Sequence, residues 1–202
     1  MAIGTYSELV TALEGWLNRT DISTKFPDFI SMFEARANRM IRHPSMETDS
    51  TSSITTSPVA VPTDFLEVRK VTAGGELVEA MSPQHLDYYY LNAEAGTPKH
   101  YALTGGEFHF RPTPSAATTI AIDYYQKIPA LTSSAATNWL LTAYPDAYLY
   151  GVLRQAFAYL RDPDGLAQAK AGEDEVLAEI EMDAARRRKP SGPLASKVRV
   201  YD

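Results

Sequence analysis

The sequence contains no cysteine, and this absence excludes several kinds of chemistry at once. Without thiols the chain can form no disulfide scaffold, no thiolate metal site and no cysteine nucleophile. Long apolar runs are missing too. No stretch approaches the roughly 18–20 residues of a membrane span, and residues 1–17 have neither a basic start nor a long apolar run. These absences predict a protein that is intracellular or assembled inside a cell, without a membrane span.

An excess of basic charge is also missing. The 202 residues carry a formal net charge of −6, which argues against general attraction to nucleic acid. The charge is uneven, because residues 186–202 hold six basic residues and one acidic residue, a net of +5, and the rest of the chain carries −11. Apolar residues make up 45%, enough for a core in one domain or one domain with an insertion.

The beginning of the chain has a helical pattern. Thr5 and Glu8 have the spacing of a capping box, in which two side chains satisfy backbone N–H groups at a helix start. A second helix is expected from Pro27 to about His43, because proline is favoured in a first turn and the residue before Pro44 avoids helical geometry. Its apolar stripe consists of Phe26, Phe29, Ile30, Phe33, Ala37, Met40 and Ile41.

The end of the chain is helical again. Pro145 begins a helix with a broad apolar face, which consists of Tyr148, Leu149, Val152, Leu153, Ala156, Phe157 and Leu160. Residues 162–165 predict a turn, and residues 166–188 predict a longer and more polar helix. Basic residues at its C-terminal end suit the helix dipole. Both apolar stripes are too extensive to face water, so we expect the two helical zones to pack together.

The middle of the chain predicts β structure. Paired glycines at 74–75 and 105–106 allow the positive φ angles of hairpin turns, so these pairs favour hairpins over phosphate-binding loops. The expected strands are residues 65–72, 77–81, 101–103, 108–110 and 119–125, with a short helix over 82–90. Residues 46–57 are rich in Ser and Thr and give no strand signal. The short connections favour antiparallel pairing throughout.

The predicted fold class is therefore α+β: a helical bundle built from the N- and C-terminal helices, with a small antiparallel β region inserted and an extended C-terminal tail. The expected divisions are residues 1–45, 46–130, 131–189 and 190–202.

Motifs for catalysis are not found. The four histidines have no metal-ligand spacing, and no nucleophile elbow, P-loop or dinucleotide-binding motif occurs. We predict no catalytic residue, no metal and no cofactor. The acidic run Glu173–Glu175 is interpreted as a solvated helix face, because catalytic carboxylates need burial or a charged neighbour.

Tyrosine clusters at 88–90, 124–125 and 144–150 have acidic rather than basic neighbours, which favours core and subunit contacts over base stacking. Three arginines on the second helix either pair with acids of a neighbouring subunit or lie on a solvated face. The candidate subunit interface consists of Arg36, Arg39, Arg42, Tyr124 and Tyr148.

A series of short motifs, none specific alone, occurs in a recognisable order. The series is Val61-Pro62-Thr63-Asp64-Phe65, Gly96-Thr97-Pro98-Lys99-His100-Tyr101, Ile122-Asp123-Tyr124-Tyr125, Thr137-Asn138-Trp139-Leu140-Leu141 and Tyr144-Pro145-Asp146-Ala147-Tyr148. Their order and spacing resemble the head–tail adaptor (connector) proteins of tailed bacteriophages, over nearly the whole chain.

The resemblance implies a non-enzymatic ring protein of the virion, commonly with twelve copies. It implies that the ring binds the portal protein, continues the DNA channel without binding the DNA specifically, and supports the next neck or tail protein. It also implies that the protein lies at the head–tail interface of the virion and is assembled in the host cytoplasm. A neck stopper, a tail terminator, a small nucleic-acid-binding protein that uses its basic tail, and an enzyme with a dispersed site stay open as alternatives.

Residues 190–202 predict a docking arm, and the resemblance implies that its target is the portal. Pro190 and Pro193 end the helix, and Val198 and Val200 alternate with Arg199 and Tyr201 in the period-2 pattern of a strand. The alternative is a frayed end. The portal-docking residues are expected to be Leu194, Lys197, Val198, Arg199, Val200 and Tyr201.

Overall fold

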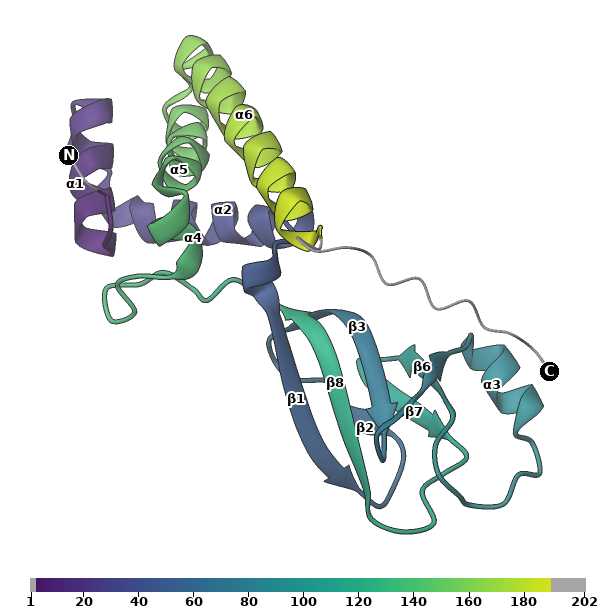
Figure 1. Ribbon diagram of the computed structural model, residues 1–202. Helices are drawn as coiled ribbons and strands as arrows, with labels where there is room; N and C mark the ends of the chain where they lie inside the picture. The colour runs from purple at the N-terminus through teal and green to yellow at the C-terminus, as the bar shows by residue number, and fades with distance from the viewer. Residues whose placement is uncertain (1–2, 190–202) are drawn as a thin grey trace. The chain divides into compact units, whose positions relative to one another are not determined.

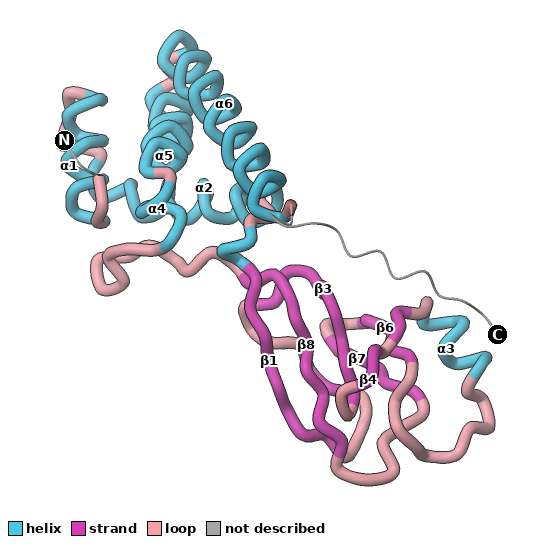
Figure 2. Tube along the Cα trace, in the orientation of Figure 1, coloured by secondary structure: helices cyan, strands magenta, loops and turns pink. Residues whose placement is uncertain are grey.

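The computed structural model describes residues 3–189, and the predicted docking arm therefore lies outside the described residues. The chain divides into two compact units. The helical unit comprises the described residues up to Ser45 and those from Ile128 onward, and the β unit runs from Met46 to Lys127. Helices other than the short α3 belong to the helical unit, and the strands belong to the β unit (Figures 1 and 2). The α+β class predicted from the sequence is confirmed.

Both ends of the chain supply helices to the helical unit. Its α-helices are α1 (Tyr6–Leu17), α2 (Phe26–Met40), α4 (Trp139–Ala143), α5 (Pro145–Leu160) and α6 (Pro163–Arg188). Two 3₁₀ turns, η1 (Ser23–Lys25) and η2 (Pro44–Met46), flank α2. The capping box at the start of α1 is present, with the Thr5 side chain accepting from the Glu8 N–H and the Glu8 carboxylate accepting from the Thr5 N–H.

The helix α5 is the centre of the helical unit, because it contacts α1, α2, α4 and α6. Phe33 of α2 is fully buried against α5, where its ring lies 5.0 Å from the ring of Tyr148. The same ring fills the space beside Gly151, where a Cβ atom would lie 2.0 Å from the Cδ2 of Phe33. The predicted packing of the two terminal zones is confirmed.

The last helix begins three residues earlier than the sequence pattern indicates. Asp162 caps it by accepting hydrogen bonds from the N–H groups of Asp164 and Gly165, and Pro163 occupies the first turn. The prediction of a separate turn at 162–165 is wrong, because the Asp-Pro-Asp-Gly sequence suits a helix start as well as a turn.

The β unit contains two four-stranded sheets. Their strands are β1 (Glu47–Ile54), β2 (Val59–Ala60), β3 (Phe65–Ala73), β4 (Glu76–Leu77), β5 (Glu79–Ala80), β6 (His100–Thr104), β7 (Glu107–Arg111) and β8 (Thr118–Gln126). One sheet has the order β1-β8-β3-β4 and the other β2-β7-β6-β5. Both predicted hairpins are present, and all four glycines of their turns have positive φ angles.

Two details of the β unit differ from the expectation. The Ser- and Thr-rich β1, for which no strand was expected, pairs with β8 along its whole length, because pairing uses the backbone and needs few apolar side chains. The expected strand 77–81 is split between the sheets, and its second part, β5, pairs with β6 in parallel. The prediction of exclusively antiparallel pairing is wrong here, since residues 81–99, with α3 (Pro83–Tyr89), form a connection long enough for a parallel crossover.

An aromatic and β-branched core joins the sheets of the β unit. The buried members are Ile54, Val71, Ala73, Val78, Tyr101, Phe108, Phe110, Ile120, Ile122 and Tyr124. Phe108 and Phe110 are fully buried and have ring centroids 5.9 Å apart. These residues alternate along their strands, which is why the period-2 pattern located most of this unit.

Candidate interaction surfaces

A buried ion cluster fixes three helices to one another. Glu173 of α6 is 1% exposed, and its Oε2 accepts a 2.6 Å hydrogen bond from Nη1 of Arg154 on α5. Its Oε1 lies 3.0 Å from Nε of Arg36 on α2, an ion pair without the angles of a hydrogen bond. Arg36 also reaches Asp174 at 3.4 Å. The expectation of a solvated face is therefore wrong for Glu173, and Arg36 pairs with acids of its own chain.

A second buried polar group lies between α2, α5 and the segment before α4. The Tyr148 hydroxyl donates to Oε1 of Glu34 at 2.8 Å, and the Asn138 amide donates to the Tyr148 oxygen at 2.6 Å. The Leu131 N–H also donates to Glu34, at 2.7 Å. Burial raises the pKa of Glu34, and burial raises the pKa of Tyr148 as well. Tyr148 is fully buried, so its side chain packs inside its own protomer and does not reach a neighbouring copy.

The other residues of the candidate subunit interface lie in different surroundings. Tyr124 is buried in the β unit, where its hydroxyl donates to Asp64 at 3.0 Å and burial raises its pKa to about 12. The Arg42 guanidinium donates to the carbonyls of Asn38 and Ile41. Arg39 is exposed. Of the five candidates, Arg39 is thus the one whose side chain lies open to a neighbouring copy, and the subunit interface stays a prediction.

An anchoring cluster surrounds Asp183 near the end of α6. Its Oδ2 accepts from the Tyr144 hydroxyl at 2.5 Å and from Nε of Arg187 at 2.7 Å, and lies 3.5 Å from Nε2 of His43. The hydrogen bond from Tyr144 lowers the pKa of Asp183, and burial lowers the pKa of His43. The His43 ring stacks on Trp139, with ring centroids 5.1 Å apart. This cluster fixes the end of α6 beside the end of α2, and the Arg188 guanidinium adds a hydrogen bond to the Arg42 carbonyl.

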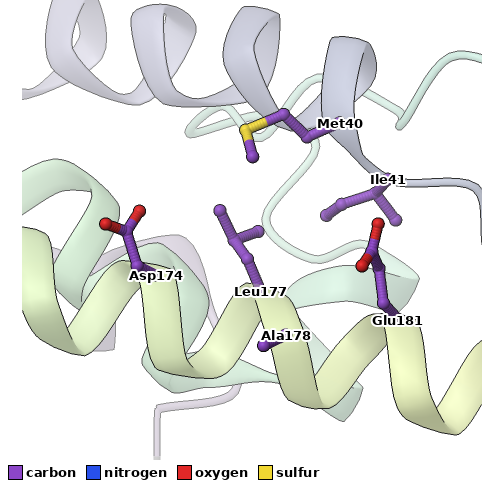
Figure 3. A pocket seen from close by; sticks show the side chains of 6 residues that line it. All are labelled: Met40, Ile41, Asp174, Leu177, Ala178 and Glu181. Atoms are coloured by element: carbon purple, nitrogen blue, oxygen red, sulfur yellow. The ribbon is translucent and has the colours of Figure 1, made fainter.

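A groove lies between α2 and α6, next to that cluster. Its volume is about 230 Å³. Ile41 and Leu177 form an apolar floor, and Figure 3 shows Met40 above it and the carboxylates of Asp174 and Glu181 at its two ends. Met40 is 47% exposed, whereas Ile41 and Leu177 are 2% and 6% exposed. The groove is therefore an open apolar site with acidic ends.

The β unit presents a different surface around α3. Tyr88 and Tyr89 are 83% and 68% exposed, and Leu91 just after the helix is 75% exposed. Tyr90 instead turns inward, and its hydroxyl lies 2.6 Å from Nδ1 of His100. The tyrosine cluster at 88–90 therefore consists of two exposed side chains and one that is half-buried. Exposed aromatic side chains of this kind are typical of protein-binding surfaces.

No arrangement in the described residues suggests a cofactor or metal. Within residues 3–189 no group of three or more His, Asp or Glu side chains could hold a metal ion. None of the helices described there is both long and apolar enough to cross a membrane. The functional features that the described residues offer are surfaces: the α2/α6 groove, the exposed face of α3, and Arg39. Sequence reasoning missed the groove, because it joins side chains about 140 positions apart, and found the others only as clusters of residue types.

Comparison with known proteins is consistent with a protein that acts through its surfaces. A search of curated proteins finds no match for the chain. The family of the SU10 adaptor protein matches residues 4–197, which is nearly the entire sequence. The match spans both terminal helical zones and the inserted β unit, as the order of the short motifs predicted. The chain therefore belongs to the SU10 adaptor protein family, a family of bacteriophage head–tail adaptors.

Proposed function

We propose that this protein is a structural component of the virion that forms a ring on the portal and continues the DNA channel towards the neck or tail. The observation that carries the proposal is the family match over residues 4–197. A match of this extent includes both units, so it supports an adaptor role for the whole chain rather than for one module.

The charge of the described residues is compatible with a channel for DNA. The helix α6 exposes Glu175, Glu179 and Glu181, and residues 173–185 contain no basic side chain. Acidic groups near a passage repel phosphates, which lets DNA move through without the counterion release that gives tight binding. A ring with such a surface would guide DNA rather than hold it.

The same surfaces suggest how the ring meets its neighbours. Arg39 is exposed on α2. In a ring it would pair with acidic residues of an adjacent copy, and the exposed acidic residues of α6 could be those partners. The aromatic face of α3, with Tyr88, Tyr89 and Leu91, suits a neck or tail protein, since exposed aromatic side chains are frequent anchors in protein interfaces. Twelve copies per ring and docking of residues 194–201 to the portal are parts of this proposal.

The test is assembly with the portal protein of the same phage. The purified chain is mixed with portal rings, and complexes are observed by negative-stain microscopy and mass photometry. We expect a ring stacked on one face of the portal. Arg39→Glu should weaken its assembly, whereas Lys170→Glu, an equal charge change at an exposed position of α6, should not. Portal rings that remain bare at micromolar adaptor concentration would contradict the proposal.

A DNA-binding measurement separates the adaptor from the nucleic-acid-binding alternative. The chain and a variant truncated after Lys189 are titrated with duplex DNA at several salt concentrations. The adaptor hypothesis expects no binding at micromolar protein. Tight binding that falls steeply with salt and disappears on truncation would favour the alternative.

A further inference from the structure

No segment of the described residues fills the α2/α6 groove, although the groove exposes apolar surface to water. Ile41 and Leu177 form its apolar floor, and Met40 at its edge keeps 47% of its surface exposed. Glu181 at one end is exposed and has no cationic partner in residues 3–189, whereas Asp174 at the other end has Arg36 at 3.4 Å. An occupant should therefore be extended, apolar on one side and basic on the other.

One segment of this chain has that chemistry. Val198 and Val200 alternate with Lys197 and Arg199, so in an extended conformation the two valines share one side and the two basic residues the other. Long basic side chains can bend to carboxylates at a rim while the valines face an apolar floor. The segment follows α6 directly, after the sequence Pro190-Ser191-Gly192-Pro193.

We propose that residues 194–201 dock into the α2/α6 groove of their own protomer when the protein is free. The end of α6 is fixed beside the end of α2, because Asp183 contacts His43 and Arg188 bonds to the Arg42 carbonyl. The chain therefore leaves α6 at the end of the groove that lies nearest Glu181. Proline and glycine in 190–193 suit a reversal of direction there.

The spacing of the residues fits this arrangement. The helical rise places Glu181 about 12 Å and Leu177 about 18 Å before Lys189. If residues 190–193 form the reversal, an extended chain of about 3.3 Å per residue brings Lys197 about 13 Å and Val198 about 17 Å back along α6. Lys197 then lies level with Glu181 and Val198 level with Leu177. Arg199, about 20 Å back, approaches Asp174 at about 22 Å.

Docking within one protomer is favoured over docking into a second copy. A linker of four residues gives the segment an effective concentration in the millimolar range at its own groove, far above the concentration of other copies in solution. Docking in the groove goes beyond the proposed function and does not depend on it. Its regulatory consequence rests on the proposed function, because a segment held in the groove is withheld from the portal until assembly releases it.

The absence of cysteine allows a direct test by disulfide formation. The double variant Ala178→Cys/Val198→Cys places one thiol in the groove and one on the docked segment, and Ala178 is exposed, so its replacement should not disturb folding. The matched control is Glu179→Cys/Val198→Cys, whose helical thiol is exposed on α6 outside the groove. Both purified full-length variants are exposed to a mild oxidant at low protein concentration, and the products are separated on a non-reducing gel.

We expect an intramolecular cross-link in the groove variant that forms at least about ten-fold faster than in the control, the advantage of a docked over a merely tethered thiol. Adding Glu181→Gln or raising the salt concentration should reduce that difference. Equal rates in the two variants, or no cross-link, would overturn the proposal. A dimeric product that increases with protein concentration would overturn it in favour of a second copy. Each outcome is read on the protein alone, so it is independent of whether a ring forms on the portal.

Discussion

The crossing of α2 and α5 predicts that a helix-favouring substitution will destabilise this protein. Gly151 lies in the middle of α5, where alanine would ordinarily stabilise a helix by about 1 kcal/mol. An added Cβ would, however, lie 2.0, 2.4 and 2.7 Å from three ring atoms of Phe33. The Phe33 ring is fully buried and meets Tyr148 on another side, so it has little space into which to move.

The expected loss follows from these two opposed effects. Overpacking of a well-packed core costs about 1–3 kcal/mol and sometimes more, and a contact this short belongs at the upper end. After subtraction of the propensity gain, Gly151→Ala should lower the free energy of unfolding by about 2 kcal/mol. The matched control is Gly15→Ala in α1, where nothing lies within 4 Å of the added Cβ. That variant should be stabilised by about 0.5–1 kcal/mol.

Urea melts of the single variants and of Phe33→Ala/Gly151→Ala measure the effect. Phe33→Ala alone should cost about 3–5 kcal/mol, because it leaves a cavity where the ring was. Addition of Gly151→Ala to Phe33→Ala should then be neutral or favourable, which gives a coupling energy of at least about 2 kcal/mol. If Gly151→Ala stabilises the protein as much as Gly15→Ala does, the close packing of α2 against α5 is refuted.

The helices could be predicted because their signals are local. The stripe containing Phe29, Ile30 and Phe33 has the period of a helix, and the structure buries all three. Asn138 caps α4 by accepting from the Leu141 N–H, three positions further along the chain. In such places the residue and the group it satisfies are a few positions apart, so the sequence alone contains the argument.

The strand β1 shows where local reasoning fails. Its sequence is polar and carries no alternation of apolar residues, yet it pairs along its whole length with β8, whose first residue lies more than 60 positions away in the chain. The alternation that defines the pair is in β8, where Ile120, Ile122 and Tyr124 are buried. A strand whose stability comes from its neighbour has no signature of its own.

The partners of the buried charged residues could not be predicted from the sequence either. Glu173 has acidic neighbours in the sequence and looks like part of a solvated face, but the fold brings Arg36 and Arg154 to it. The apolar stripe of α6 does indicate that Glu173 is buried. Ala169, Val176 and Ile180 lie on the same side of the helix as Glu173 and are buried. A carboxylate inside an apolar stripe predicts burial, although its partners come from other helices.

Three further predictions concern these buried polar groups, and urea melts test them all. Glu173→Gln should lower the free energy of unfolding by about 3 kcal/mol, because it leaves two arginines without their carboxylate, while Glu175→Gln, at an exposed position, should change it by less than about 0.5 kcal/mol. A loss below 1 kcal/mol would show that water replaces the carboxylate. Asn138→Ala should cost about 1–2 kcal/mol through loss of the α4 cap, and a variant that melts like the wild type would contradict that assignment. The last prediction uses the raised pKa of Glu34. Below the pKa that this carboxyl has in the unfolded chain, it is protonated in both states and contributes no pH dependence. As the pH rises through that value, the unfolded state loses its proton first, so the contribution of Glu34 to stability decreases until the pH exceeds the folded pKa. Glu34→Gln keeps an oxygen that can accept from Leu131 and Tyr148 but cannot ionise, so the variant should gain stability relative to the wild type between pH 4 and pH 7. A difference between wild type and Glu34→Gln that stays constant over this range would mean that Glu34 is charged in the folded protein as readily as in the unfolded chain.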